Sequence, residues 1–200
     1  KREIRREVIG FDINKERIDE LNKNFDRTLE VNQEELKSLK NIIFVDDINR
    51  LIDADVFIIT VPTPVDKNNT PDLSFTINAS NKVGELLLRR KELKKPSKPV
   101  VVFESTVFPS ATEEIFIPAI EKHSKLKLND DFICGYSPER VNPGDKTKKI
   151  TNIIKVTSGS NKEASIWIDN FYSSFIDAGT FLAKSIRIAE AAKVIENTQR

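Results

Sequence analysis

The sequence has few of the residues from which metal and disulfide sites are built. It contains one cysteine and one histidine among 200 residues. One cysteine excludes an internal disulfide framework and is typical of a reducing compartment. One histidine and one cysteine are too few for a zinc site of the usual type, so we expect no metal. Cys134 lies in an apolar stretch and is expected in the core, and His123 is expected at a solvated helix end.

Neither charge nor hydrophobicity is concentrated in one part of the chain. The 32 basic and 31 acidic residues give a formal net charge of +1, which argues against an extended nucleic-acid-binding face. No apolar run approaches the roughly 20 residues that cross a bilayer, and the apolar run after the basic start is too short for a signal peptide. We therefore expect a cytoplasmic protein with no nucleic-acid or membrane partner. The pattern GxxxxGK[ST] is absent, which excludes P-loop chemistry.

The segment 56–61 is a candidate central strand. Five of its six residues are apolar, without the alternation of a half-exposed strand, so we expect helices over both faces as in a parallel sheet. Pro62 and Pro64 end the strand because proline cannot donate a hydrogen bond to a neighbouring strand. Ligands of open α/β sheets lie beyond the carboxyl ends of the strands. The loop 60–64 is therefore a candidate site.

Strands and helices are predicted to alternate along the chain, which indicates βαβ units. Strands are expected at residues 7–12, 41–45, 56–61, 100–103, 131–135 and 153–157. Helices are expected after Asn14, which is the candidate N-cap, over 47–52 and 73–90, from Ser110 or Thr112 as cap to 122, and over 162–175 and 185–200. The segment 24–40 is open between helix and loop. The predicted class is α/β, a Rossmann-like doubly wound parallel sheet.

Polar side chains follow two of the predicted strands. Asp12 lies where a dinucleotide-binding fold has an acid that binds the adenosine ribose, although the Gly-rich turn expected about 20 residues upstream is absent. A helix-capping acid is the alternative. Glu104, Ser105 and Thr106 suit hydrogen bonds to a nicotinamide ribose or an ordered water, and a simple turn is the alternative.

Two further segments carry candidate binding residues. The loop 137–145 contains two prolines, a glycine, two acids and an arginine, more than a connector needs. Arg140 and exposed backbone N–H groups of this loop can bind phosphate. Lys193 and Asn197 are four residues apart and share one face of the last helix, where they can stabilise an oxyanion. A solvated polar face is the alternative for this pair.

Taken together, these motifs resemble the UDP-glucose/GDP-mannose dehydrogenase family, in particular its branch of UDP-N-acetylglucosamine 6-dehydrogenases of polysaccharide synthesis. The motifs occur in family order along nearly the whole chain, and the last two are long and specific. They are VIGFD at 8–12, ITVPTP at 59–64, ESTV at 104–107, GYSPERVNPGD at 135–145 and AEAAKVIENT at 189–198.

The resemblance implies an NAD-dependent oxidation of the C6 alcohol of a UDP-N-acetylhexosamine, through an aldehyde, to the uronic acid. Asp12 would hold the adenosine ribose of NAD, with Arg17 near the adenine. Thr63 and Thr106 would contact the cofactor, and Glu139 would lie between cofactor and substrate.

The resemblance also implies which residues bind the substrate. The sugar-diphosphate part would be bound by Arg140, Val141 and Asn142. Lys193 and Asn197 would bind the substrate and stabilise oxyanions, so that the implied catalytic set is Lys193, Asn197, Glu139 and Thr106. The UDP-sugar epimer stays open.

The sequence departs from the family pattern in three ways: it lacks the first strand with its Gly-rich turn, the catalytic cysteine and the C-terminal domain. We therefore expect a fragment that is inactive alone, with a partial NAD-binding Rossmann-like domain at 1–183 and the start of a central dimerisation helix at 184–200. The full-length protein is expected to be a homodimer or higher homo-oligomer.

The alternative to a dehydrogenase is a non-catalytic nucleotide-binding or regulatory α/β module. A receiver-like signalling domain is disfavoured because no acid completes a pocket with Asp46 and Asp47.

Overall fold

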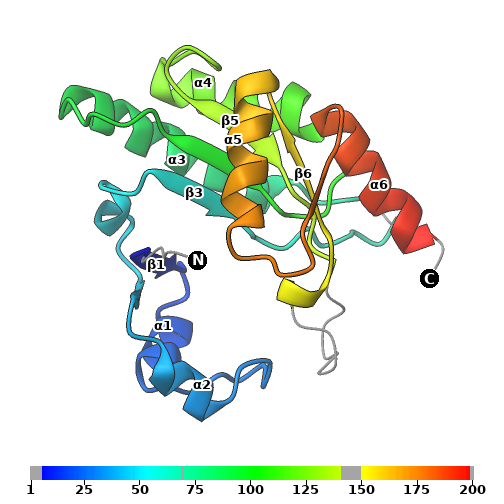
Figure 1. The fold of residues 1–200 in the computed structure, drawn as a ribbon. Coiled ribbons are helices and arrows are strands. Elements are labelled where there is room, and N and C mark those ends of the chain that lie inside the picture. Colours follow the sequence, from blue (N-terminus) through cyan, green and yellow to red (C-terminus); the bar gives the residue numbers. More distant parts are fainter. Residues whose placement is uncertain (1–5, 69, 141–149, 199–200) are drawn as a thin grey trace. The chain divides into compact units, whose positions relative to one another are not determined.

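The computed structural model describes residues 6–68, 70–140 and 150–198. These residues divide into two compact units, one that ends at Asp53 and one that begins at Ala54 (Figure 1). Both units are built from strands and helices in alternation, as the sequence predicts. The sequence also predicts a boundary between residues 183 and 184, where the NAD-binding domain would meet the central helix. The division at residues 53 and 54 does not test that boundary, which stays a prediction.

The first unit contains a parallel pair of strands, β1 (Val8–Phe11) and β2 (Ile42–Val45). Helix α1 (Lys15–Asn22) follows β1. The side chain of Asn14 accepts a hydrogen bond from the backbone N–H of Arg17 at 3.1 Å, so Asn14 is the N-cap that the sequence predicts.

The segment that the sequence left open is a loop followed by a short helix. Helix α2 (Gln33–Ser38) begins with a capping box, in which Asn32 and Glu35 exchange side-chain and backbone hydrogen bonds. The 3₁₀ helix η1 (Ile48–Leu51) follows β2, close to the range predicted for it.

A five-stranded sheet with the order β3-β4-β5-β6-β7 forms the centre of the second unit. Its first three strands are parallel to one another, and β7 is parallel to β6. The predicted α/β class is confirmed, and β7 is a strand that the sequence did not indicate. The strands are β3 (Val56–Ile59), β4 (Val100–Phe103), β5 (Ile133–Tyr136), β6 (Lys155–Gly159) and β7 (Thr180–Leu182).

Strand β6 runs opposite to β5, which corrects the expectation of a wholly parallel sheet. Tyr136 pairs with Ser158 and Gly135 with Gly159. A parallel partner would require a crossover back to the other end of the sheet, whereas β6 begins at the edge where β5 ends. Lys155, the first residue of β6, therefore lies at the same edge as the carboxyl ends of β4 and β5.

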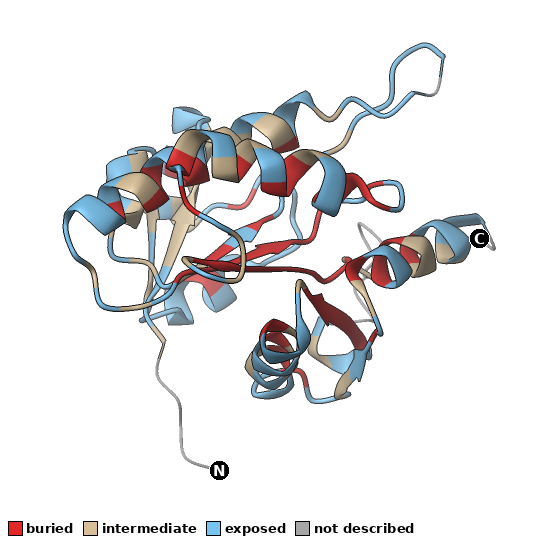
Figure 2. Cartoon of the chain, turned by 90° about the horizontal axis from the view of Figure 1, so that it is seen from above, coloured by how far each residue is buried: buried red, intermediate tan, exposed pale blue. Residues whose placement is uncertain are grey.

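Helices pack on both faces of this sheet (Figure 1). Helix α5 covers the face formed by Val100, Val102 and Ile133. Because side chains alternate along a strand, Phe103 points to the opposite face, where its ring stacks on Phe116 with 5.0 Å between centroids. Figure 2 shows that buried positions concentrate on the strands and on the helix faces turned toward them. The helices are α3 (Ser74–Glu92), α4 (Ile117–Ser124), α5 (Lys162–Ser173) and α6 (Ile186–Thr198), and short turns are η2 (Thr112–Phe116) and η3 (Ile150–Asn152).

Strand β3 is covered less completely than its apolar sequence predicts. Phe57 and Ile59 are 5% and 6% exposed, but Ile58 is 43% exposed. Strand β3 is a terminal strand of the five-stranded sheet, and α5 packs mainly on β5, β6 and β7, with Val56 of β3 at the margin of the same cluster. The expectation that both faces are covered is therefore wrong at Ile58.

Candidate functional site

The loops that follow β3, β4 and β5 are tied to one another at the carboxyl edge of the sheet. The hydroxyl of Ser105 donates to the carbonyl of Val61 at 2.6 Å, and the buried hydroxyl of Tyr136 donates to the carbonyl of Ser105 at 3.1 Å. The hydroxyl of Ser137 donates to the carbonyl of Val156 in β6 at 2.8 Å. These bonds fix the backbone of the segments that the sequence singled out as candidate sites.

A buried ion pair lies beneath these loops. Nζ of Lys155 is 3.0 Å from Oε2 of Glu104, and the hydroxyl of Tyr172 on α5 donates to Oε1 of Glu104 at 2.5 Å. The side chain of Lys155 is 2% exposed and that of Glu104 is 10% exposed. Burial, followed by the nearby charge of Glu104, raises the pKa of Tyr172 well above its usual range. Both oxygens of Glu104 thus have protein partners, and its predicted bond to a ribose or an ordered water stays a prediction.

Glu139 lies in the loop after β5 and is contacted by residues of strand β6 and helix α6. One oxygen of its carboxylate accepts a hydrogen bond from the backbone N–H of Arg140 at 2.6 Å, and the other lies 4.0 Å from Nζ of Lys155. Nζ of Lys193, from α6, donates to the main-chain carbonyl of Glu139. Lys193 is 7% exposed. The structure therefore brings together Glu139 and Lys193, two of the four residues of the implied catalytic set.

The other members of the implied substrate and catalytic sets differ in their surroundings. Arg140 forms an ion pair with Glu196 of α6 at 3.1 Å. Asn197 is exposed one turn beyond Lys193. Val141 and Asn142 lie outside the described residues.

The two threonines assigned to the cofactor lie in loops at this edge. Thr106 is exposed and directly follows Ser105, whose hydroxyl is bonded to the β3 loop. The hydroxyl oxygen of Thr63 is buried and has no hydrogen-bond partner among the described residues. A buried hydroxyl without a partner is costly, and a ligand that hydrogen-bonds to Thr63 would remove that cost.

The loop after Thr106 is held by α6 through a residue to which the sequence analysis gave no role. Glu190 is fully buried, and its carboxylate accepts hydrogen bonds from the backbone N–H groups of Ser110 at 2.6 Å and Thr112 at 2.9 Å. Burial is the largest influence on Glu190 and raises its pKa, against the opposing effect of these hydrogen bonds. Neither Ser110 nor Thr112 caps η2 with its own side chain, because Glu190 provides that cap.

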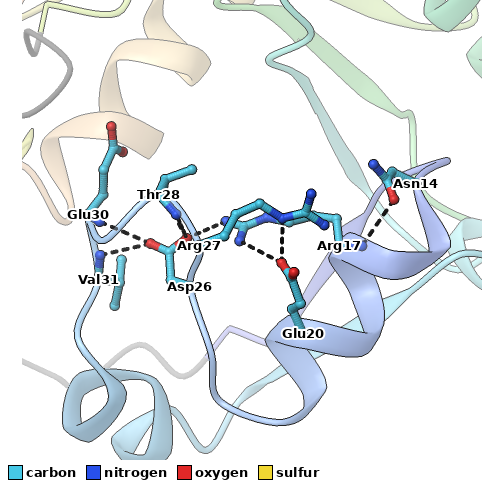
Figure 3. Close-up of polar contacts among 8 residues, drawn as sticks. All are labelled: Asn14, Arg17, Glu20, Asp26, Arg27, Thr28, Glu30 and Val31. Carbon is cyan, nitrogen blue, oxygen red and sulfur yellow. Dashed lines mark hydrogen bonds and ion pairs between the residues drawn. The ribbon is translucent and has the colours of Figure 1, made fainter.

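The candidate adenosine-binding residues lie in the first unit. Asp12 is exposed at the end of β1, and its carboxylate accepts a hydrogen bond from the backbone N–H of Asn14 at 2.8 Å. Arg17 of α1 pairs with Asp26 at 2.7 Å and lies 3.7 Å from Glu20 (Figure 3). The guanidinium of Arg17 is therefore held by carboxylates of its own unit.

Asp26 organises the loop between α1 and α2 (Figure 3). Its carboxylate accepts hydrogen bonds from the hydroxyl and backbone N–H of Thr28 and from the backbone N–H groups of Glu30 and Val31. Burial alone would raise the pKa of Asp26, but the hydrogen bonds from Val31, Thr28 and Arg17 outweigh it and hold that pKa far below its ordinary value of 3.8.

Cys134 and His123 lie where the sequence predicts them, in the core and at a helix end. Cys134 is fully buried, and burial raises the pKa of its thiol beyond the usual range, so it is no activated nucleophile. Within the described ranges, no group of three His, Cys, Asp or Glu side chains is placed to hold a metal ion. His123 lies 3.9 Å from Glu85 at the end of α4.

Sequence reasoning missed Lys155, Tyr172 and Glu190. Lys155 lies within the strand predicted at 153–157, and a lysine in a strand is usually solvated. Glu190 lies inside a motif that carried the family resemblance, and its position beside small residues was the one available signal. Its partners are 78 and 80 residues away in the sequence, so no local pattern identifies them.

The sequence of the chain matches the model of a known protein family. The model of the UDP-glucose/GDP-mannose dehydrogenase family, NAD binding domain, matches residues 2–176. The chain belongs to this family. The resemblance inferred from the motifs is thereby confirmed, and the NAD cofactor that it implied is supported by the domain that matches.

Curated relatives place the chain near one branch of the UDP-glucose/GDP-mannose dehydrogenase family. The chain is 50% identical over 196 residues to UDP-N-acetyl-D-glucosamine 6-dehydrogenase of Pseudomonas aeruginosa, covering 98% of this chain and 44% of the relative. It is 49% identical over 193 residues to protein CapL of Staphylococcus aureus, covering 96% of this chain and 43% of CapL. The chain thus spans less than half the length of these relatives.

Solved structures share the fold. A ternary complex of GDP-mannose dehydrogenase from Pseudomonas aeruginosa matches with a TM-score of 0.85 at 26% identity, covering 96% of this chain and 44% of that one. A UDP-D-ManNAc dehydrogenase from Pyrococcus horikoshii matches with a TM-score of 0.83 at 30% identity, covering 97% and 45%. Both likenesses extend over almost all of the present chain.

Proposed function

We propose that the protein carrying this chain is an NAD-dependent 6-dehydrogenase of a UDP-N-acetylhexosamine. The C6 alcohol loses a hydride and a proton to give an aldehyde, and the aldehyde loses a second hydride. Water enters either by hydrating the aldehyde before this second hydride leaves or by hydrolysing the enzyme-bound acyl group afterwards, and the protons released leave a carboxylate. Each hydride reduces one NAD to NADH, so about two NADH form per sugar. The 50% identity to a UDP-N-acetyl-D-glucosamine 6-dehydrogenase supports the choice of substrate.

The observation that carries the proposal is the position of Lys193. This lysine is buried, comes from the motif of α6 that carried the family resemblance, and donates to the carbonyl of Glu139 at the sheet edge. A buried ammonium beside a candidate substrate loop can stabilise an alkoxide as the hydride leaves. We assign Lys193 and Asn197 to oxyanion stabilisation, and Glu139 and Thr106 to the boundary between cofactor and substrate.

The residues proposed for NAD fit such a ligand. Thr63 offers a buried hydroxyl that has no hydrogen-bond partner within the described ranges, and Asp12 offers an exposed carboxylate at a strand end, the position that binds a ribose in dinucleotide folds. We assign Asp12 and Arg17 to the adenosine part, and Thr63 and Thr106 to further cofactor contacts. When bound, NAD supplies the hydride acceptor.

The substrate phosphates are assigned to the loop that begins with Arg140, together with Val141 and Asn142. Arg140 is already oriented by its ion pair with Glu196 of α6, and a guanidinium suits phosphate because it carries five N–H donors in a planar fork. The nucleophilic cysteine of the family is assigned to a part of the protein outside these 200 residues, because the thiol of Cys134 is fully buried.

We further propose that the protein acts in the cytoplasm as a homo-oligomer. The unpaired thiol of Cys134 suits a reducing compartment. Among the residues that the structure describes, no helix is long and apolar enough to cross a membrane.

Ile188 and Ile195, two turns apart on α6, are 48% and 58% exposed and suit a helix–helix interface. Sedimentation of the full-length protein and of its Ile195→Glu variant tests the interface, and an unchanged oligomer in the variant would exclude it.

The activity is tested with the full-length protein that carries this chain. NADH formation is followed by absorbance with NAD and, in turn, UDP-N-acetylglucosamine, UDP-N-acetylgalactosamine and UDP-glucose. We expect the highest kcat/KM with one of the two N-acetylated sugars. NADH from none of the three would overturn the proposal and would favour a non-catalytic nucleotide-binding module.

A further inference from the structure

The buried ion pair of Lys155 and Glu104 lies at the edge of the proposed site and has no part in the function proposed above. Three elements bring it together: Glu104 follows β4, Lys155 begins β6, and Tyr172 comes from α5. Taking two charges out of water is costly, and a buried pair often stabilises a fold no better than apolar residues of the same volume. A gain in stability therefore does not by itself explain why this pair is buried here, and a role in the site is the alternative explanation.

The geometry directs Lys155 toward one particular residue of the site. Its ammonium lies 3.0 Å from Glu104 and 4.0 Å from the carboxylate of Glu139, and it stands 5.5 Å from the ring centre of Tyr172. An ammonium has three N–H donors, and Glu104 takes one of them. Glu139 is the nearest described carboxylate to which another donor can turn.

We propose that Lys155 is a positioning residue for Glu139 in the dehydrogenase reaction. This inference rests on the proposed function. Tyr172 and Glu104 hold the Lys155 ammonium at the sheet edge, and Lys155 fixes the direction of the Glu139 carboxylate between cofactor and substrate.

Packing restricts the side chain of Glu139 less than it restricts that of Lys155. Its side chain is 40% exposed, in contrast to the 2% of Lys155. The N–H of Arg140 donates to one oxygen of the Glu139 carboxylate, and the second oxygen lies 4.0 Å from Nζ of Lys155. A rigid buried cation next to a partly exposed carboxylate selects one of its rotamers.

A purely structural role for Lys155 predicts a different outcome from a role that acts through Glu139. If the lysine only stabilises the fold, its removal should harm every version of the enzyme equally. If it acts through Glu139, its removal should matter only while the carboxylate is present, because interacting residues have non-additive effects.

The test is a double-mutant cycle in the full-length protein with NAD and UDP-N-acetylglucosamine. The four proteins are the wild type, Lys155→Met, Glu139→Gln and the double variant. We expect Lys155→Met to lower kcat by roughly 10- to 100-fold, the size of effect caused by misplacing a reacting group. KM for NAD and for the sugar should change by less than about threefold. In the Glu139→Gln protein, the same substitution should change kcat by less than about twofold.

Two further variants keep the test decisive. Lys91→Met removes another lysine from an ion pair, that with Asp131 at 3.2 Å, and should leave kcat and KM unchanged because Lys91 is 59% exposed. If Lys155→Met fails to fold, Lys155→Met combined with Glu104→Leu replaces the whole pair by apolar side chains. This variant takes the place of Lys155→Met in the cycle, and its fold is checked by circular dichroism and thermal unfolding.

The outcomes separate the two proposals. An equal loss of kcat with and without the Glu139 carboxylate, or a higher KM at an unchanged kcat, would overturn the positioning role and leave the proposed function intact. A wild-type protein that forms no NADH would overturn the proposed function itself.

Discussion

Lys193 is buried, and its ammonium donates a hydrogen bond to the main-chain carbonyl of Glu139. A buried lysine is held in one conformation, which lowers the reorganisation needed when negative charge develops nearby. In the proposed reaction this charge develops on the C6 oxygen as the hydride leaves. The residue therefore provides the most direct point at which the catalytic assignment can be tested.

We predict that Lys193→Met lowers kcat of the full-length protein by about 100- to 1,000-fold, the usual cost of removing a group that stabilises an oxyanion. The side chain keeps its length and apolar stem, so the fold should be retained. Steady-state NADH formation with UDP-N-acetylglucosamine measures the effect. Lys184→Met, at an exposed position just before α6, is the matched control and should retain the wild-type rate. A Lys193→Met protein as fast as the control would remove Lys193 from the mechanism.

Asp26 gives a prediction about pH. Its pKa in the folded protein lies below the ordinary 3.8, so its contribution to stability is present above pH 3.8 and is lost as pH falls through the lower folded value. Asp26→Asn should cost about 1–3 kcal/mol at pH 7, because the amide cannot accept all the hydrogen bonds of the carboxylate. Urea unfolding of both proteins from pH 7 to pH 3 measures this difference. A difference that grows rather than shrinks below pH 3.8 would contradict the account.

At the residue scale, contacts between near neighbours in the sequence were predictable, and contacts between residues far apart in the sequence were not. Asn14 caps α1 as predicted, since a cap depends on neighbours three residues away. The partners of Glu104 were not predicted, because Lys155 and Tyr172 are 51 and 68 residues away. Sequence spacing alone does not determine which distant side chains meet.

Helix α6 acts on the site as a whole element. Glu190 and Lys193 are three residues apart and point from the same side of the helix. Glu190 binds the start of η2, and Lys193 binds the first loop residues after β5. Helix α6 thereby fixes two strand-end loops relative to each other.

We predict that Glu190→Ala destabilises the second unit by about 2–4 kcal/mol, because two buried backbone N–H groups lose their acceptor. Denaturant unfolding of the variant measures this loss. Glu114→Ala is the control: Glu114 is 66% exposed and pairs with Arg187 at 3.5 Å, so its removal should cost less than about 1 kcal/mol. Equal losses in the two variants would show that the buried cap is not what stabilises this region.

Element positions were predictable where the local pattern is strong. The strand predicted at 100–103 has the observed bounds of β4, because four fully apolar residues lie between polar turns. Strand β7 was missed because its three residues are too few for a periodic pattern. The reversal of β6 was missed because strand direction depends on how the chain returns to the sheet, which apolar patterns do not encode.

At the scale of the whole molecule, the candidate residues divide between the two units. Asp12 and Arg17 belong to the first unit, and Thr63, Thr106, Glu139 and Lys193 belong to the second. The family match extends from residue 2 to residue 176 and so includes most of both. The chain covers 44% of the Pseudomonas aeruginosa relative, so the proposed activity belongs to the full-length protein.

The central claim is that this full-length protein oxidises an alcohol to a carboxylate with NAD. Its most direct test is the stoichiometry of the completed reaction, with limiting UDP-N-acetylglucosamine and excess NAD, NADH measured by absorbance and the sugar product by mass spectrometry. We predict about two NADH for each UDP-sugar consumed and a UDP-N-acetylhexosaminuronic acid as product. One NADH per sugar with an aldehyde as the final product, or consumption of the sugar without NADH, would contradict the account.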